Sequence, residues 1–262
     1  VKLLDSTLVS LTMSVYDWAH YTTKKGAVKM HTLLDYDSLL PEFVNVTTGK
    51  TTDNKAAYDM PVAPHSVVVA DRGYCDYRLL EHWDSNKVFF VVRHKENMRY
   101  VISTEERPLP EKSAQNVLID EVVELELPES KRKYPKKLRR IAVWNGEHGH
   151  VVELLTNNFV LAASTIAELY RQRWQIEIFF RNLKQLLRIK SFVGTTRNAV
   201  ETQIWTAMIT MLLLCWLKHT AKYKWALANL VVSLRLNTFT KIDLEKWLNE
   251  PFTPPPDTSM IT

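Results

Sequence analysis

Residues 65–77, HSVVVADRGYCDY, are the stretch that decides how the chain folds. The run Val67–Ala70 is continuously apolar, which is typical of a short strand buried on both faces of a sheet. It ends in Asp71, and Gly73 then marks a turn. Open α/β sheets place ligand-binding groups at the carboxyl ends of such strands, so Asp71 is a candidate site residue. An ordinary aspartate in a turn after a strand would give the same local pattern.

The patterns around this stretch indicate an α/β fold. Three consecutive strand patterns and a short helical segment precede it, and a helix and a further strand follow, at residues 2–12, 27–36, 41–48, 53–60, 76–83 and 87–95. This order of elements is expected of a ribonuclease H-like fold. We therefore predict a ribonuclease H-like mixed sheet with helices.

The character of the chain changes twice after this part. Short strand-like pieces at 99–103, 120–128, 139–146 and 150–157 are separated by polar or proline-containing segments, which predicts a β-rich insertion. The following residues are helical in pattern, and the proline-rich end is predicted to be a disordered tail. The predicted organisation is residues 1–95 for the first part of the ribonuclease H-like domain, 96–156 for the insertion, 157–250 for the helical second part and 251–262 for the tail.

Residues 170–190, YRQRWQIEIFFRNLKQLLRIK, carry six basic side chains and one carboxylate. Helical periodicity gathers five polar side chains within an arc of roughly 80°, namely Tyr170, Arg173, Glu177, Arg181 and Lys184. The neighbouring arc is an apolar stripe that can dock on a core, made of Leu169, Ile176, Phe180, Leu183 and Leu187. Periodicity alone is equally compatible with a solvated helix in which Glu177 pairs with arginines one turn away.

The spacing Tyr-x2-Arg-x3-Glu-x6-Lys resembles the YREK signature of DDE transposases of the insertion-sequence-four family. The approach to this helix, LTNNFVLAASTIAELYRQRWQIEIFF, is also similar to that family. The resemblance implies that Glu177 binds a catalytic metal ion. It also implies that Tyr170, Arg173 and Lys184 hold the transposon-end DNA, and we add the neighbouring Arg181 as a DNA contact.

A site with two metal ions for phosphoryl transfer needs further carboxylates from other elements. Asp71 lies in Asp-x-Gly-Tyr, which resembles the family's motif around its second catalytic aspartate, and Asp5 lies in Asp-Ser-Thr, which resembles the motif on its opening strand. A charge within such an apolar strand is costly to bury unless it is paired or binds metal. We predict Asp5, Asp71 and Glu177 as catalytic metal ligands, for two Mg²⁺ ions or for Mn²⁺ as a substitute. Three other acids were interpreted as turn or loop residues, namely Asp17, Asp35 and Asp37.

Residues 131–140, KRKYPKKLRR, hold seven cations in ten positions and are a second candidate for phosphate contacts. The side chains predicted to bind DNA are Lys131, Arg132, Lys133, Lys136 and Lys137. A solvated basic loop is the competing interpretation. The resemblance also implies that an aromatic residue of the insertion stabilises a flipped base, and Trp144 is the candidate, although a tryptophan that packs within the insertion is the simpler reading.

Composition limits the classes of function that the chain can have. A formal charge of +5 favours a polyanionic partner only weakly. The two cysteines, Cys75 and Cys215, lie far apart and outside any zinc pattern, which fits a reducing cytoplasm. The apolar stretch 204–217 is shorter than a membrane-spanning helix and predicts a buried core helix, so we expect no membrane. The chain starts with Val1 almost at the first strand, which suggests a fragment.

The sequence therefore predicts a transposase catalytic domain that cuts and joins double-stranded DNA at transposon ends and target, in the bacterial cytoplasm with the nucleoid, and that is a dimer when assembled on DNA. Two alternatives stay open. One is a ribonuclease H-like nuclease of another class, which would share the acids but would not need the YREK spacing. The other is an inactive DNA-binding remnant of a transposase.

Overall fold

The computed structural model describes residues 1–11, 16, 18–19, 26–103, 116–146, 149–186 and 192–252. The chain divides into two compact units, Val1–Phe180 and Arg181–Thr262. The division falls inside helix α5 (Trp174–Leu186). The domain limits that we predicted at residues 95, 156 and 250 stay a prediction.

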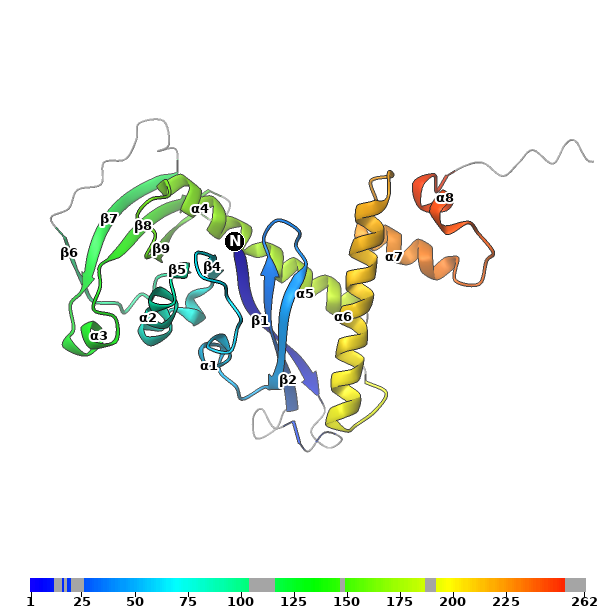
Figure 1. The fold of residues 1–262 in the computed structure, drawn as a ribbon, viewed down its shortest axis with the longest axis horizontal. Coiled ribbons are helices and arrows are strands. Elements are labelled where there is room, and N and C mark those ends of the chain that lie inside the picture. The colour runs from blue at the N-terminus through cyan, green and yellow to red at the C-terminus, as the bar shows by residue number, and fades with distance from the viewer. Residues whose placement is uncertain are drawn as a thin grey trace, which may run out of the picture. The chain divides into compact units, whose positions relative to one another are not determined.

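The first unit is built on one nine-stranded sheet with the order β3-β2-β1-β4-β5-β9-β8-β7-β6 (Figure 1). Its first five strands are β1 (Lys2–Leu11), β2 (Gly26–Asp35), β3 (Pro41–Thr48), β4 (Val67–Ala70) and β5 (Phe89–Arg93). The first three run antiparallel to one another, while β4 pairs in parallel with both β1 and β5. With α1 (Asp53–Ala57) and α2 (Tyr77–Ser85) between the strands, this is the element order predicted for a ribonuclease H-like fold. The predicted α/β fold class is confirmed.

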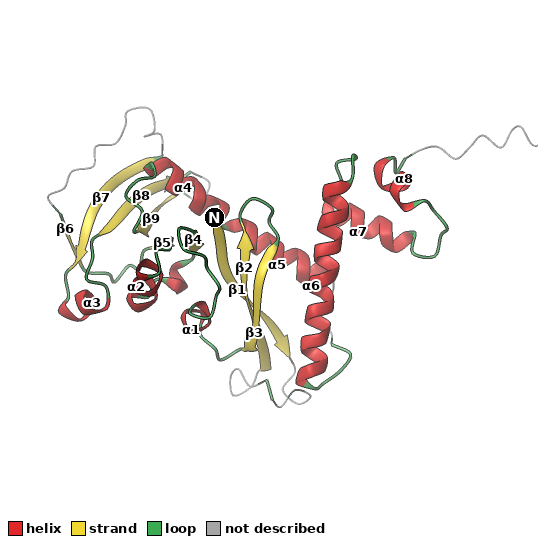
Figure 2. Cartoon of the chain, in the orientation of Figure 1, coloured by secondary structure: helices red, strands yellow, loops and turns green. Residues whose placement is uncertain are grey.

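The strands between the second aspartate and the glutamate helix extend the same sheet. They are β6 (Tyr100–Ile102), β7 (Val117–Leu125), β8 (Leu138–Asn145) and β9 (His150–Thr156), and they pair antiparallel in the order 9-8-7-6. Strand β9 also pairs with β5, where Thr156 lies opposite Val91. The predicted strands are therefore present, and they continue the central sheet instead of forming a separate one (Figure 2). A short helix, α3 (Pro128–Lys133), connects β7 to β8.

Alternation along the central strands divides the core between the two faces of the sheet. Val68 and Phe90 pack in one cluster with Leu79, Leu80 and Trp83 of α2. Asp76 caps α2 by accepting hydrogen bonds from two backbone amides of its first turn, those of Arg78 and Leu79. The alternate strand residues Leu3, Val69 and Val91 are equally buried but belong to the other face. Helix α4 (Ala163–Gln172), which contacts β4 and β5, carries the buried side chains Ile166 and Leu169.

The predicted apolar stripe of the glutamate helix is buried. Leu169, Ile176, Phe180 and Leu183 are all shielded from solvent, and Leu187 lies outside the described residues. The single helix predicted from periodicity is interrupted, however. Helix α4 ends at Gln172, Arg173 is its C-cap, and α5 begins at Trp174. No glycine or proline at this position marks the break in the sequence.

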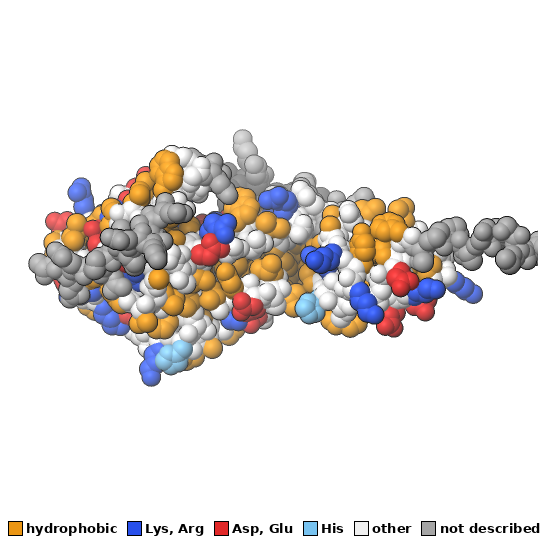
Figure 3. Space-filling model, turned by 90° about the horizontal axis from the view of Figure 1, so that it is seen from above, with side chains coloured by type: hydrophobic (Ala, Val, Ile, Leu, Met, Phe, Trp, Pro, Cys, Tyr) orange, Lys and Arg blue, Asp and Glu red, His pale blue; other side chains and the backbone are white. Residues whose placement is uncertain are grey.

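The second unit contains α6 (Arg197–Thr220), α7 (Leu227–Leu236) and α8 (Leu244–Asn249). Trp225, Leu230 and Leu248 form its small core, and the Trp225 indole N–H donates to the Leu248 carbonyl at 2.8 Å. The stretch predicted as a core helix belongs to α6, which is buried along one side only. Its exposed apolar side chains are Trp205, Ile209, Leu212, Leu213 and Trp216, and Figure 3 shows hydrophobic side chains at the surface of this unit.

Helix α6 is long and apolar enough to cross a membrane by length and composition, a property it shares with core helices of soluble proteins. Within the most apolar window of the helix, 33% of the residues are buried. In the predicted tail, residues 253–262 lie outside the described part of the chain. Both cysteines are free thiols, Cys75 buried and Cys215 partly buried.

Candidate active site

Parallel pairing brings Asp5 and Asp71 to neighbouring positions. Leu4 of β1 lies opposite Ala70 of β4, and the two aspartates are the next residues of their chains. Side chains at matched positions of neighbouring strands point to the same face. Asp5 and Asp71 therefore share one face of the sheet, at the carboxyl end of β4.

The turn after β4 holds Asp71 in place. Its carboxylate accepts a hydrogen bond from the Gly73 backbone N–H at 2.7 Å and caps the short 3₁₀ helix η1 (Arg72–Tyr74). A Cβ atom on residue 73 would lie 2.9 Å from the Asp71 Oδ1 atom, closer than real side chains approach. The Asp-x-Gly pattern thus has a physical reason, because only glycine leaves room for this carboxylate to fold back on the turn.

Arg173 links the glutamate helix to the strand acids. Its guanidinium donates to the Glu177 Oε1 atom at 2.7 Å, and its Nη1 atom lies 3.5 Å from the Asp5 Oδ2 atom. The guanidinium carbon also lies 5.7 Å from the centre of the Tyr170 ring, within the range of a cation–π contact. The Arg173 side chain is only 14% exposed, and its Nε atom is buried without a hydrogen-bond partner. The junction between α4 and α5 therefore places one cation between two of the predicted metal ligands.

The acids act on one another electrostatically. Burial raises the pKa of Asp5 from 3.8 to about 7, and the negative charges of Asp71 and Glu177 act in the same direction. The Ser6 backbone N–H and the Arg173 guanidinium oppose this rise. Burial likewise raises the pKa of Tyr170, while nearby arginine charges act to lower it. The charges of Asp71 and Glu177 thus both act on the carboxyl of Asp5.

Asp5, Asp71 and Glu177 do not form a preformed metal site. Within the described ranges, no three His, Cys, Asp or Glu side chains stand close enough to hold an ion. The donor set does have the chemistry of a divalent cation site, since three carboxylates from β1, the β4 end and α5 supply hard oxygen ligands. Burial, helped by the charges of Asp71 and Glu177, raises the pKa of Asp5, and a bound cation would favour its charged form.

The remaining predicted residues of the glutamate helix lie on the last turns of α5, in the second unit. Arg181 is exposed and Lys184 is partly buried. Both follow Glu177 at helical spacing, by four and seven residues, which is consistent with the predicted shared face. Their proposed contact with DNA stays a prediction.

Two of the rival acids have other roles. The Asp35 carboxylate bonds the Lys2 ammonium at 2.9 Å and accepts a hydrogen bond from the Ser38 backbone N–H, also at 2.9 Å. These partners, first of all the Ser38 amide, lower the pKa of Asp35. Asp37 is exposed in the same turn, and Asp17 lies outside the described residues. Asp35 and Asp37 are therefore turn acids, as predicted.

The basic stretch 131–140 separates into outward and inward parts. Lys131 and Arg132 are exposed on α3, and the Lys133 ammonium bonds Glu129 of the same helix at 2.9 Å. The Lys136 ammonium bonds Asp84 at 2.8 Å, while Lys137 is exposed.

The last two cations of that stretch turn inward. Arg139 is 1% exposed and donates to both Asp120 carboxylate oxygens at 2.7 Å and to the carbonyls of Asn158 and Leu161. Arg140 bonds Glu121 and Glu153. These two arginines are buried among β7, β8 and β9, which the local sequence did not indicate. Trp144 on β8 is 43% exposed, and its suggested role at a flipped base stays a prediction.

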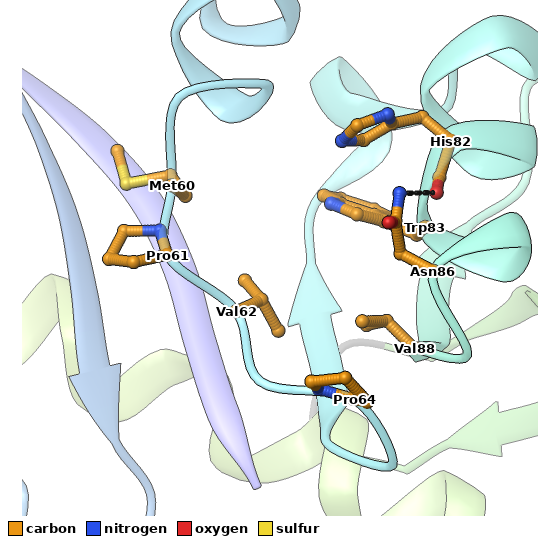
Figure 4. Close-up of a pocket in the computed structure, with 8 residues that line it drawn as sticks. All are labelled: Met60, Pro61, Val62, Pro64, His82, Trp83, Asn86 and Val88. Carbon is orange, nitrogen blue, oxygen red and sulfur yellow. Dashed lines mark hydrogen bonds between the residues drawn. The ribbon is translucent and has the colours of Figure 1, made fainter.

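Two surface hollows flank α2. One, of about 270 Å³, is lined by Arg78, Glu81, Arg132 and Lys133. The other, of about 250 Å³, lies between α2 and the segment that leads into β4, and Figure 4 shows its mainly apolar lining, which includes Met60, Pro61, Val62 and Trp83. The three acids line neither hollow.

Sequence reasoning passed over one charged side chain beside Asp71, namely Arg93 at the end of β5. The sequence does contain a signal for Arg93, because this cation directly follows a buried apolar run, as Asp71 does.

The chain is similar to known transposases. Residues 1–213 match the family model described as "Transposase DDE domain". The chain is 34% identical over 215 residues to the putative transposase y4zB of Sinorhizobium fredii and 32% identical over 222 residues to the probable transposase for insertion sequence element IS5377 of Geobacillus stearothermophilus. These alignments cover 82% and 85% of this chain, but only 60% and 58% of the relatives.

Among solved structures, the chain is similar to a piggyBac transposase synaptic complex with hairpin DNA. The TM-score is 0.49 at 12% identity, over 97% of this chain and 58% of the other, which is too low to establish a shared fold. The family model covers most of the chain, and both curated relatives exceed 30% identity. The predicted resemblance is confirmed, and the chain belongs to the DDE transposases.

Proposed function

We propose that this chain is the catalytic domain of a DNA transposase that cleaves and joins strands at transposon ends. The observation that carries this proposal is the placement of Asp5 beside Asp71 on paired strands, with Arg173 between Asp5 and Glu177, in a chain of the DDE transposase family. The chain spans about 60% of the length of its curated relatives. End recognition and the complete transposition reaction are therefore assigned here as part of the proposal.

DDE transposases depend on divalent metal ions, and we propose two Mg²⁺ ions here, with Mn²⁺ as a substitute. Asp5, Asp71 and Glu177 would hold them. When bound, such ions activate the attacking water or 3′-hydroxyl and stabilise the leaving oxygen. No covalent intermediate with the protein is needed, which agrees with a site made of carboxylates.

In this proposal Arg173 binds carboxylates in the free protein and a DNA phosphate in the complex. In the structure its guanidinium compensates Glu177 and approaches Asp5. A DNA phosphate, like a carboxylate, offers a pair of oxygen acceptors that a guanidinium can bind at once. We therefore assign Arg173 to the DNA strand next to the acids, together with Tyr170, whose ring it contacts, and Lys184 further along α5. Arg181 and the cations Lys131, Arg132, Lys133, Lys136 and Lys137 are proposed as further contacts to double-stranded DNA.

We further propose that the protein acts on nucleoid DNA in the bacterial cytoplasm and assembles as a dimer on transposon ends. A dimer brings two ends into one complex, which a cut-and-paste reaction requires. The exposed apolar side chains of α6 are compatible with assembly, but they do not identify the partner surface.

The test uses the complete protein with duplex DNA that carries the transposon ends and compares wild type with Asp71→Asn. The amide keeps the shape of the side chain but removes its charge. Strand cleavage in Mg²⁺ should be lost, while DNA affinity stays level or rises because repulsion from phosphate is relieved. Cleavage that survives in the variant would remove Asp71 from the site. Binding by the wild type without cleavage in Mg²⁺ or Mn²⁺ would identify the inactive remnant.

A further inference from the structure

Arg93 completes a row of charged side chains across three strands. Val69 and Ala70 of β4 lie opposite Val91 and Val92 of β5, so the next pair in this register is Asp71 and Arg93. The same extension places Asp5 beside Asp71. Matched positions on neighbouring strands point to one face. Asp5, Asp71 and Arg93 therefore lie in one row across the inner strands β1, β4 and β5, on the face opposite α2.

The second observation is the position of Tyr170. Helix α4, which carries Tyr170, contacts β5, and the charge of Arg93 acts on the Tyr170 hydroxyl against the effect of its burial. Arg93 and Arg173 thus both lie near the same tyrosine. Tyr170 is the uncharged member of the predicted DNA-binding signature, so Arg93 belongs to the same surroundings as that signature.

The third observation is that the charge of Arg93 is not compensated within the described part of the chain. No acid there forms an ion pair with Arg93, although the side chain is partly buried. Its neighbours differ in this respect, since Arg72 bonds Glu96 at 2.7 Å and Arg140 bonds Glu153 at 2.9 Å. A partly buried guanidinium with open donors is a strong binder of carboxylates and phosphates, because its fixed fork matches a pair of their oxygen atoms.

We propose that Arg93 is an additional phosphate-binding residue of this site, which holds the DNA backbone between Asp71 and Tyr170. This inference rests on the proposed function, because it assumes that DNA binds on the face of the sheet that carries Asp5 and Asp71. It extends the basic surface beyond the helix signature to the sheet itself. The DNA strand would then be held from two sides, by α4 and α5 and by the end of β5.

The experiment measures binding of duplex DNA by the complete protein in EDTA, so that cleavage does not interfere, across a series of salt concentrations. Replacing Arg93 with alanine should weaken binding about tenfold, as expected for loss of a charge-assisted hydrogen bond. It should also flatten the slope of log affinity against log salt by about 0.9. Arg93→Lys should restore the slope but not the full affinity, since lysine keeps the charge and loses the fork.

Lys50→Ala is the matched control. Lys50 is an exposed cation in the turn after the edge strand β3, two strands away from β1, and its removal should leave the salt slope at the wild-type value. Thermal unfolding of each variant separates a folding defect from a loss of contact. An unchanged salt slope in a folded Arg93→Ala protein would overturn the inference while wild-type binding and cleavage still support the transposase. A wild type that neither binds nor cuts DNA would instead refute the proposed function.

Discussion

Arg139 and Arg173 are both guanidiniums placed among carboxylates, but only one of them is satisfied. Arg139 in the insertion strands has a bidentate partner in Asp120 and two backbone carbonyls, and it is almost fully buried. Arg173 lies between Glu177 and a more distant Asp5, with its Nε atom unpartnered. A complete network fixes structure, whereas an incomplete one keeps acids and a cation available for ligands.

The largest effect should follow from opening the complete network. Arg139→Met leaves Asp120 without its guanidinium and two buried carbonyls without their donor, which should cost about 3–5 kcal/mol of unfolding free energy. Urea denaturation measures this. The double variant Arg139→Met with Asp120→Leu should recover the part of the loss that comes from the unpaired carboxylate, whereas the two carbonyls stay without their donor. A cost below about 1 kcal/mol for the single variant would show that the network is not structural.

The incomplete network should respond in the opposite way. Glu177→Gln keeps a hydrogen-bond acceptor for Arg173 but removes a proposed metal ligand. Cleavage should fall more than about 100-fold, since even residues that only support metal ligands contribute 10–100-fold. The unfolding free energy should stay level or rise. A stability loss like that of Arg139→Met would make Glu177 a structural residue and erase the contrast between the two arginines.

The pH dependence of stability sharpens the same contrast. The unfolded Asp5 carboxyl loses its proton near pH 3.8, whereas the folded carboxyl keeps its proton up to about pH 7. Between these values the folded state binds more protons, so this group makes stability decline as pH rises. In EDTA, Asp5→Asn should remove that decline and be more stable than wild type at pH 8, by on the order of 2 kcal/mol. Urea titrations from pH 4 to 8 test this, and a wild type that gains stability relative to the variant over this range would contradict it.

The smallest effect concerns the outer turns of α5. Arg181→Ala and Lys184→Ala should each flatten the salt dependence of DNA binding by about 0.9, with stability changes below about 1 kcal/mol. Tyr170→Phe carries no charge change and should leave the slope as it is. A flattened slope in Tyr170→Phe would mean that the helix signature acts through folding instead of through phosphate contacts.

Sequence alone predicted the fold through patterns that are local. The run Val67–Ala70 shows a buried strand without knowledge of its neighbours, and the strand, turn and helix order follows from similar signals. The register that sets Asp5 beside Asp71 is not local. It followed only from the resemblance to a family, because strand pairing depends on which surfaces are buried together.

The features that escaped prediction depend on distant partners. Arg139 and Arg140 look like part of a solvated basic run, and only the pairing of β7, β8 and β9 brings acids against them. Arg93 looks like an ordinary end of a strand until β4 is placed beside it. The break at Arg173 is also invisible locally, since no glycine or proline marks the end of α4.

Because β9 pairs with β5, strands β6 to β9 cannot be deleted without exposing the side of β5 that they cover. Without β9, the run Phe89–Arg93 would become an open edge of five residues with three valine or phenylalanine side chains fully buried at present, Phe90, Val91 and Val92. Exposed apolar edges recruit strands from other molecules and promote aggregation. In the intact chain the sheet instead ends at β6, which is only three residues long and a poor template. Shortened versions of this protein should therefore keep residues 116–156, because these strands protect its solubility as well as its shape.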